Sequence, residues 1–136
     1  MRESELIKAE KDYDREIDLA CEKGDRKAAQ RCFEAFIASR KRYLESEPAT
    51  VKDVIARLDR LIREGCDEDP DSGLQPIRST FVAVRGYLRM KGSVHQAASS
   101  LWRALQFAEM FDVGQDYQKL IFSCIKRLER PGLARN

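Results

Sequence analysis

The chain has 136 residues, of which 43% are apolar and 35% charged, and its formal net charge is +2. A chain of this length can bury about two-thirds of its unfolded surface, so it can form a core without disulfides or metal. No segment approaches eighteen consecutive apolar residues, which excludes a membrane span, and the N-terminus lacks the apolar segment of a secretory signal peptide. Four prolines and seven glycines favour long helices over a strand-rich fold.

The four cysteines, Cys21, Cys32, Cys66 and Cys124, are scattered along the chain and form no C-x-x-C pair. Their spacing does not suit a zinc site, and free cysteines on apolar stripes behave as small hydrophobic residues. The sequence therefore predicts a protein of a reducing, cytoplasmic compartment, with no metal, no cofactor and no membrane partner.

Apolar residues recur at spacings of three and four over residues 4–23 and again over 26–45, which predicts two helices. Ser4 is the expected N-cap of the first helix, and Gly24-Asp25 the turn into the second. So short a break predicts an antiparallel hairpin. The second helix is expected to bury Phe33 and Ile37 along its stripe.

Thr50 and Asp53 form a variant capping box that opens a third helix, which ends near Glu64. Arg57 and Arg60 fall off the apolar stripe of this helix and are expected to face solvent. Residues 66–75 then crowd four carboxylates around a proline and a glycine, which predicts an acidic loop. The loop fails the calcium-binding pattern at its sixth and twelfth positions.

Three further helices are expected in the rest of the chain. The fourth covers 76–91, with Pro76 at its start and Gly92 at its end, and the fifth opens with a capping box of Ser93 and Gln96. Trp102 is expected in the core. A capping arrangement over 112–115 starts the sixth helix, which runs to Arg130.

Together these elements predict an all-α fold: a single-domain bundle of about six helices arranged as consecutive antiparallel hairpins. The N-terminal helices occupy about 4–64, the acidic loop 66–75 and the C-terminal helices about 76–130 of one domain, 1–136.

Charge divides unevenly along the chain, with 15 basic against 19 acidic residues over 1–74 and 10 against 4 over 75–136. A basic C-terminal half predicts contact with an anionic partner, whether nucleic acid or an acidic protein surface. The candidate anion-binding residues are Arg78, Arg85, Arg89, Lys91 and Arg103.

Within residues 81–128, Tyr87-Leu88, Gly92-Ser93-Val94, Ala97-Ala98 and Leu101 resemble the first helix and turn of bacterial helix-turn-helix regulators. The resemblance implies a nucleic-acid-binding regulator, which is one alternative function. The chain departs from the pattern after Leu101, where the candidate recognition helix is largely apolar rather than polar.

Arg89 and His95 have the R-x5-H spacing of the HEPN ribonucleases, to which the chain is similar at these positions. That resemblance implies a more remote alternative, a nuclease with His95 as general acid–base and Arg89 holding a phosphate. Met90 stands where that family tends to have a polar residue.

Large apolar side chains lie partly off the main stripes of the C-terminal helices, and such residues dominate protein interfaces. The candidate partner-binding residues are Tyr87, Phe107, Met110 and Phe111. The sequence therefore favours a non-enzymatic regulatory or adaptor protein that works through a helical surface, either on another protein or on a second copy of itself. No small-molecule substrate is indicated.

Overall fold

The computed structural model describes residues 1–64, 74–110 and 114–130, with the side chains of 74–76 left out. It contains six helices: α1 (Glu3–Glu22), α2 (Arg26–Glu45), α3 (Val51–Glu64), α4 (Leu74–Arg89), α5 (Val94–Met110) and α6 (Gln115–Glu129). The described residues hold no β-strand. The predicted all-α fold of six helices is confirmed. Most of the predicted acidic loop, 66–75, lies outside the described residues.

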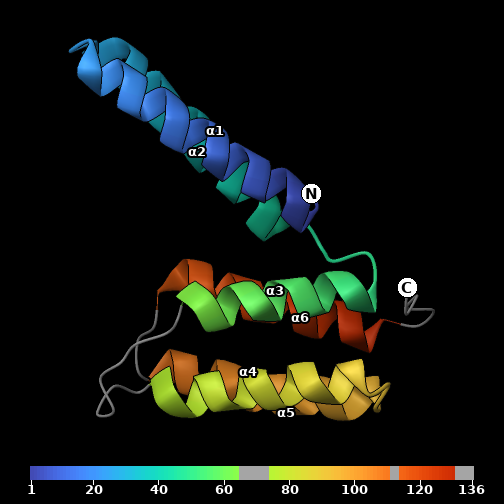
Figure 1. Cartoon of the computed structure of the whole chain (residues 1–136). Coiled ribbons are helices and arrows are strands. Elements are labelled where there is room, and N and C mark those ends of the chain that lie inside the picture. The colour runs from blue at the N-terminus through green and yellow to red at the C-terminus, as the bar shows by residue number, and fades with distance from the viewer. Residues whose placement is uncertain (65–73, 111–113, 131–136) are drawn as a thin grey trace. The chain divides into compact units, whose positions relative to one another are not determined.

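The helices group into two compact units, residues 1–46 and 47–136. The first unit is the antiparallel pair α1 and α2 (Figure 1). At its turn Gly24 adopts a left-handed φ of +64°, and Asp25 accepts a hydrogen bond from the Ala28 amide at 3.0 Å. The predicted hairpin turn is therefore correct. The predicted cap at Ser4 is wrong, because α1 begins at Glu3 with Arg2 as its N-cap, two residues earlier, and no side chain caps it.

The pair is held together by a narrow interface. The rings of Tyr13 and Phe36 stack with centroids 4.7 Å apart, and Leu6 and Tyr43 are buried. Phe33 and Ile37, expected in the core, are 47% and 43% exposed. Two helices share one interface, so a helix whose apolar stripe is wider than that interface leaves part of the stripe uncovered.

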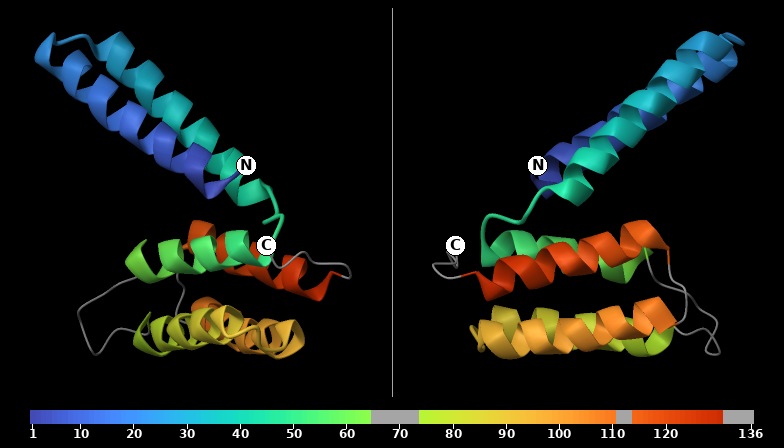
Figure 2. Two further views of the ribbon diagram at one scale, coloured as in Figure 1. Left: turned by 45° about the vertical axis from the view of Figure 1, so that its right-hand side comes forward. Right: turned by 180° about the vertical axis from the view of Figure 1, so that it is seen from behind.

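The second unit is a four-helix bundle in which α3, α4, α5 and α6 run up and down in turn (Figures 1 and 2). Each helix packs against two others, in the closed order α3–α4–α5–α6 and back to α3. The core is built from aliphatic and aromatic side chains that recur at spacings of three and four along all four helices. Its fully buried members include Val54, Leu58, Leu61, Ile77, Phe81, Leu101, Ile121 and Ile125.

The ends of α3 and α4 test the predicted caps. The Thr50–Asp53 box is present: the Asp53 amide donates to Thr50 Oγ1 at 3.2 Å, and Asp53 Oδ2 accepts from the Thr50 amide at 3.3 Å. The α4 helix starts at Leu74 rather than Pro76 and ends at Arg89. Lys91, in the turn before Gly92, has a left-handed φ of +58°.

The starts of α5 and α6 differ from the predicted capping arrangements. Ser93 Oγ accepts from the Gln96 amide at 3.4 Å, but the Gln96 side chain accepts from Tyr87 instead of returning to Ser93. The start of α6 has Gly114 as N-cap without a side-chain hydrogen bond, and Asp112 lies outside the described residues.

The prediction that two arginines of α3 face solvent is wrong. Arg57 and Arg60 are both buried. Arg57 Nη1 donates to the hydroxyl of Ser123 on α6 at 2.9 Å, and Arg60 Nη1 lies 3.0 Å from Glu64 Oε1. Buried charges of this kind are tolerated only where polar partners replace water. The hydrophobic pattern of the helix cannot predict this burial, because it assigns every charged residue outside the apolar stripe to the surface.

Candidate functional site

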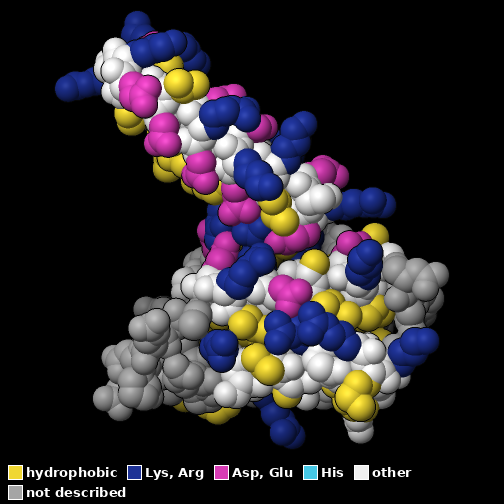
Figure 3. Space-filling model, in the orientation of Figure 1, with side chains coloured by type: hydrophobic (Ala, Val, Ile, Leu, Met, Phe, Trp, Pro, Cys, Tyr) yellow, Lys and Arg dark blue, Asp and Glu magenta, His cyan; other side chains and the backbone are white. Residues whose placement is uncertain are grey.

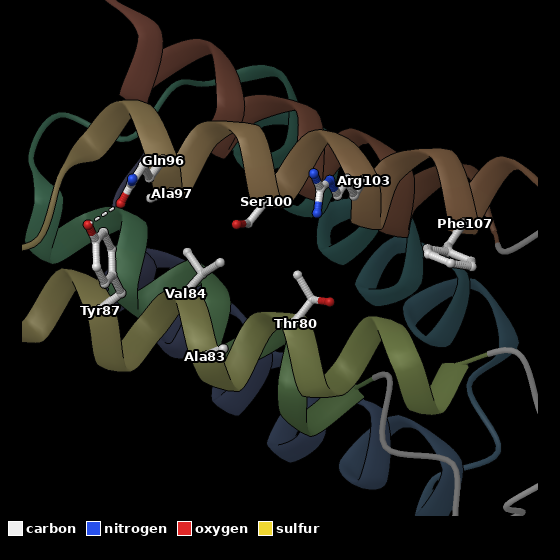
Figure 4. A pocket seen from close by; sticks show the side chains of 9 residues that line it. All are labelled: Thr80, Ala83, Val84, Tyr87, Gln96, Ala97, Ser100, Arg103 and Phe107. Atoms are coloured by element: carbon white, nitrogen blue, oxygen red, sulfur yellow. Dashed lines mark hydrogen bonds between the residues drawn. The ribbon is translucent and has the colours of Figure 1, made fainter.

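A groove of about 370 Å³ runs along the second unit between α4 and α5 (Figure 4). Val84 of α4 and Ala97 of α5 are buried in the groove. Its sides are formed by other residues of these two helices. The complete lining is Thr80, Ala83, Val84 and Tyr87 from α4, with Gln96, Ala97, Ser100, Arg103 and Phe107 from α5.

Tyr87 is fixed at one end of the groove by two neighbours. Its hydroxyl donates to Gln96 Oε1 (Figure 4). Its ring lies directly over Gly92, where an added Cβ would be 2.6 Å from the ring Cδ1. A side chain at position 92 would therefore push this ring aside, whereas the backbone of Gly92 is not in the left-handed region.

Phe107 lies at the other end of the groove, with Arg103 between it and Ser100; Figure 4 shows the Phe107 ring directed toward α4 and the Arg103 guanidinium lying along α5. Both side chains are exposed. Among the described residues no acidic side chain lies within ion-pair distance of Arg103. A carboxylate of a partner could therefore reach this guanidinium without displacing a described carboxylate of the chain itself.

The groove side of α5 has a regular spacing. Gln96, Ser100, Arg103, Phe107 and Met110 follow one another at intervals of four, three, four and three residues. Such a line stays on one face of a helix, and small residues along it admit a second helix closely. Met110 is largely exposed at the end of the line. Phe111, the fourth predicted partner-binding residue, lies outside the described residues.

The predicted line of basic residues on α4 is organised around a carboxylate. Arg85 donates to Asp59 Oδ1 of α3 at 2.7 Å, and Arg89 lies 3.7 Å from the same oxygen. Figure 3 shows basic side chains gathered beside an acidic one over α3 and α4. Asp59 thus neutralises part of the positive charge on this face. Of the remaining candidates, Arg78 is half-buried, whereas Lys91 is exposed in the turn after α4.

The residues of the predicted nuclease site do not gain further catalytic neighbours in the described structure. His95 is exposed in the first turn of α5, and Arg89 faces Asp59. Within the described ranges, no group of three or more His, Cys, Asp or Glu side chains could hold a metal ion. Among the described residues, no hydrogen bond or ion pair joins Arg89 to His95.

Trp102 lies at the surface of α5, which corrects the expectation that it fills the core. Its Nε1 donates to Glu129 Oε1 of α6 at 2.5 Å, and its ring meets Phe122 edge-on with centroids 6.0 Å apart. Lys126 Nζ lies 5.7 Å from the centre of the Phe122 ring. These residues form a small exposed aromatic cluster on a different side of α5 from the groove.

One group in the second unit has a strongly shifted pKa. Burial, reinforced by the nearby Glu64 carboxylate, raises the pKa of Tyr117 to about 12. Its hydroxyl donates to the Leu61 carbonyl at 3.4 Å, and its ring packs beside Phe81. Tyr117 therefore joins α6 to α3 and α4 as a neutral phenol, and its place within the bundle gives it a structural role.

In comparisons with known proteins, no family model matches the sequence, and searches of curated proteins and of solved structures find no significant match. Among the described helices, none is both long and apolar enough to cross a membrane.

Proposed function

We infer that this chain is a non-enzymatic adaptor whose α4–α5 groove binds an acidic, amphipathic helical segment of another protein. The observation that carries the proposal is the groove itself, which combines buried small side chains with exposed Tyr87 and Phe107 at its two ends. A concave apolar surface with a few polar groups is the usual form of a binding site.

The spacing along the groove supports a helix as the occupant. From Gln96 to Phe107 the α5 side advances eleven residues, about 16 Å at 1.5 Å per residue, which matches three turns of a bound helix. A helix in a groove is recognised through apolar side chains at positions i, i+3 or i+4, and i+7. Tyr87 and Phe107 then contact the large apolar residues at the two ends of that segment.

Charge supports an acidic occupant. Residues 74–110 of α4, α5 and their turn carry five basic residues, Arg78, Arg85, Arg89, Lys91 and Arg103, and one acidic residue, Glu109. Asp59 offsets part of this charge, but Arg103 lies within the groove lining and has no acidic neighbour among the described side chains. Complementary charge steers the encounter and selects the partner.

Selection from a random peptide library displayed on phage tests the proposal. We expect wild-type protein to enrich acidic peptides with apolar residues at helical spacing. An enriched peptide, measured by fluorescence anisotropy, should lose at least about tenfold in affinity on Phe107→Ala or Tyr87→Ala, the loss typical of an interface anchor.

Phe122→Ala is the matched control, since Phe122 is 43% exposed against 40% for Phe107 and belongs to the same bundle. It should bind the peptide as tightly as wild type. Enrichment of peptides without helical spacing, or equal binding by the Phe107 and Phe122 variants, contradicts the proposal.

A further inference from the structure

Basic side chains gather on the surface that α3 and α4 share, around the carboxylate of Asp59. Arg78, Arg85 and Arg89 recur on α4 at intervals of seven and four residues, so they lie on one side of that helix. Asp59 Oδ1 of α3 lies 2.7 Å from Arg85 and 3.7 Å from Arg89. The side chain of Arg89 is nevertheless 55% exposed, so it remains open to a further anion.

Antiparallel packing brings two lysines to one end of this surface. Lys52 lies seven residues before Asp59, close to two helical turns and therefore on the same side of α3. Lys91 lies six residues after Arg85, in the turn that follows α4. Because α3 and α4 run in opposite directions (Figure 1), both lysines lie beyond the Arg85–Asp59 pair in the same direction. Both are exposed, and no described carboxylate lies within ion-pair distance of either.

We call this surface the basic face. Its cations are Lys52, Arg78, Arg85, Arg89 and Lys91. Asp59 offsets one of these positive charges, so the face as a whole attracts anions.

The basic face lies on the opposite side of α4 from the groove. Two residues separate Arg78 from Thr80, and two separate Tyr87 from Arg85 and from Arg89. At 100° per residue, a separation of two residues turns the side chain to the far side of the helix. The basic face is therefore distinct from the proposed adaptor groove, and it can be altered without changing the groove lining.

Among the described residues, the basic face has no large apolar anchor. Val82 lies among the arginines of α4 and is 37% exposed, but α3 has no aromatic residue. The aromatic residues of α4 lie elsewhere, Phe81 in the core and Tyr87 in the groove. Protein interfaces depend on large anchors, and single-stranded nucleic acids are held by stacking on aromatic rings. Clustered cations without either feature suit the phosphate backbone of a duplex.

We propose that the basic face binds the phosphate backbone of double-stranded nucleic acid without sequence preference. From Arg78 to Arg89 the row on α4 advances eleven residues, about 16 Å at 1.5 Å per residue, which spans roughly five phosphates of one strand at about 3.4 Å each. Lys52 and Lys91 extend the row at the Arg89 end. Asp59 positions Arg85 and Arg89 but also competes with phosphate for them.

Fluorescence anisotropy of a short labelled DNA duplex of mixed sequence, titrated with the full chain, tests the proposal. Wild type should bind at ~50 mM salt. The logarithm of its affinity should fall against the logarithm of the salt concentration with a slope of about −3 to −4, the value for about four neutralised phosphates. Lys52→Gln with Arg89→Gln should reduce this slope by about two and the affinity at ~50 mM salt by at least ~tenfold.

The matched control is Lys119→Gln with Arg103→Gln, which removes the same two residue types from exposed positions of α6 and α5. This variant should bind the duplex nearly as tightly as wild type, although Arg103 belongs to the groove. Far-UV circular dichroism checks that each variant keeps its helices. Absence of binding at low salt, or equal losses in the two double variants, overturns the proposal.

Removing the competing carboxylate supplies a test in the opposite direction. Asp59→Asn should strengthen duplex binding because Arg85 and Arg89 then have only phosphate to pair with. Glu109→Gln removes the same charge from an exposed position of α5 and should have little effect. Poly-glutamate that displaces the duplex as well as unlabelled duplex does, at equal charge concentration, would assign the face to acidic proteins and overturn the nucleic-acid proposal.

Discussion

The buried contact between Arg57 and Ser123 makes a quantitative prediction about stability. Arg57 Nη1 donates to Ser123 Oγ at 2.9 Å, and that hydroxyl donates onward to the Leu120 carbonyl at 2.7 Å. Ser123→Ala removes one acceptor from a buried cation while leaving the volume of the site almost unchanged. A hydrogen bond to a charged group contributes about 1.5–3 kcal/mol. We therefore expect Ser123→Ala to lower the free energy of unfolding by about 2 kcal/mol.

Urea denaturation followed by tryptophan fluorescence measures this loss. Trp102 is the only tryptophan and lies in the second unit, so its emission reports on the four-helix bundle. With a slope of about 2 kcal/mol/M, the expected loss lowers the urea midpoint by ~1 M. Ser99→Ala, at an exposed position of α5, is the matched control and should change stability by less than about 0.5 kcal/mol.

A double-mutant cycle separates the hydrogen bond from the serine itself. With Arg57→Met the cation is absent, and Ser123→Ala should then cost less than in wild type, giving a coupling energy of about 1–2 kcal/mol. If Ser123→Ala costs the same with and without Arg57, or costs no more than Ser99→Ala, the buried hydrogen bond does not stabilise the bundle and the reasoning fails.

Two further predictions follow from the second unit. Because burial raises the pKa of Tyr117 to about 12, folding favours its neutral phenol. The stabilisation that Tyr117 gives the folded state is fully present below the unfolded pKa of about 10 and is lost as the pH rises through 12. After a discount for the partial exposure of the side chain, this stabilisation amounts to about 1 kcal/mol. Urea titrations near pH 9 and pH 11.5 should show this loss in wild type beyond that in Tyr117→Phe, and equal losses would refute it. Gly92→Ala should displace the Tyr87 ring and weaken the binding of a selected groove peptide, as Tyr87→Ala does. The urea midpoint should change little. Unchanged peptide affinity would show that Tyr87 does not form the end of the site.

The sequence was informative where a local rule decides the structure. The Gly24-Asp25 turn and the Thr50–Asp53 box depend on neighbouring residues only, and both are present. Burial depends on which helices pack together, and sequence spacing does not contain that information. Arg57 is buried because α6 supplies Ser123, and Phe33 is exposed because the hairpin has only one internal interface.

The candidate site was predicted in part for the same reason. Tyr87 and Phe107 were identified from their positions off the main stripes, and the structure places both in one groove. The small residues between them could not be recognised as a lining, because their partners belong to a different helix. Trp102 was assigned to the core from its place on the apolar stripe of the fifth helix, although a surface position satisfies its ring nitrogen through Glu129.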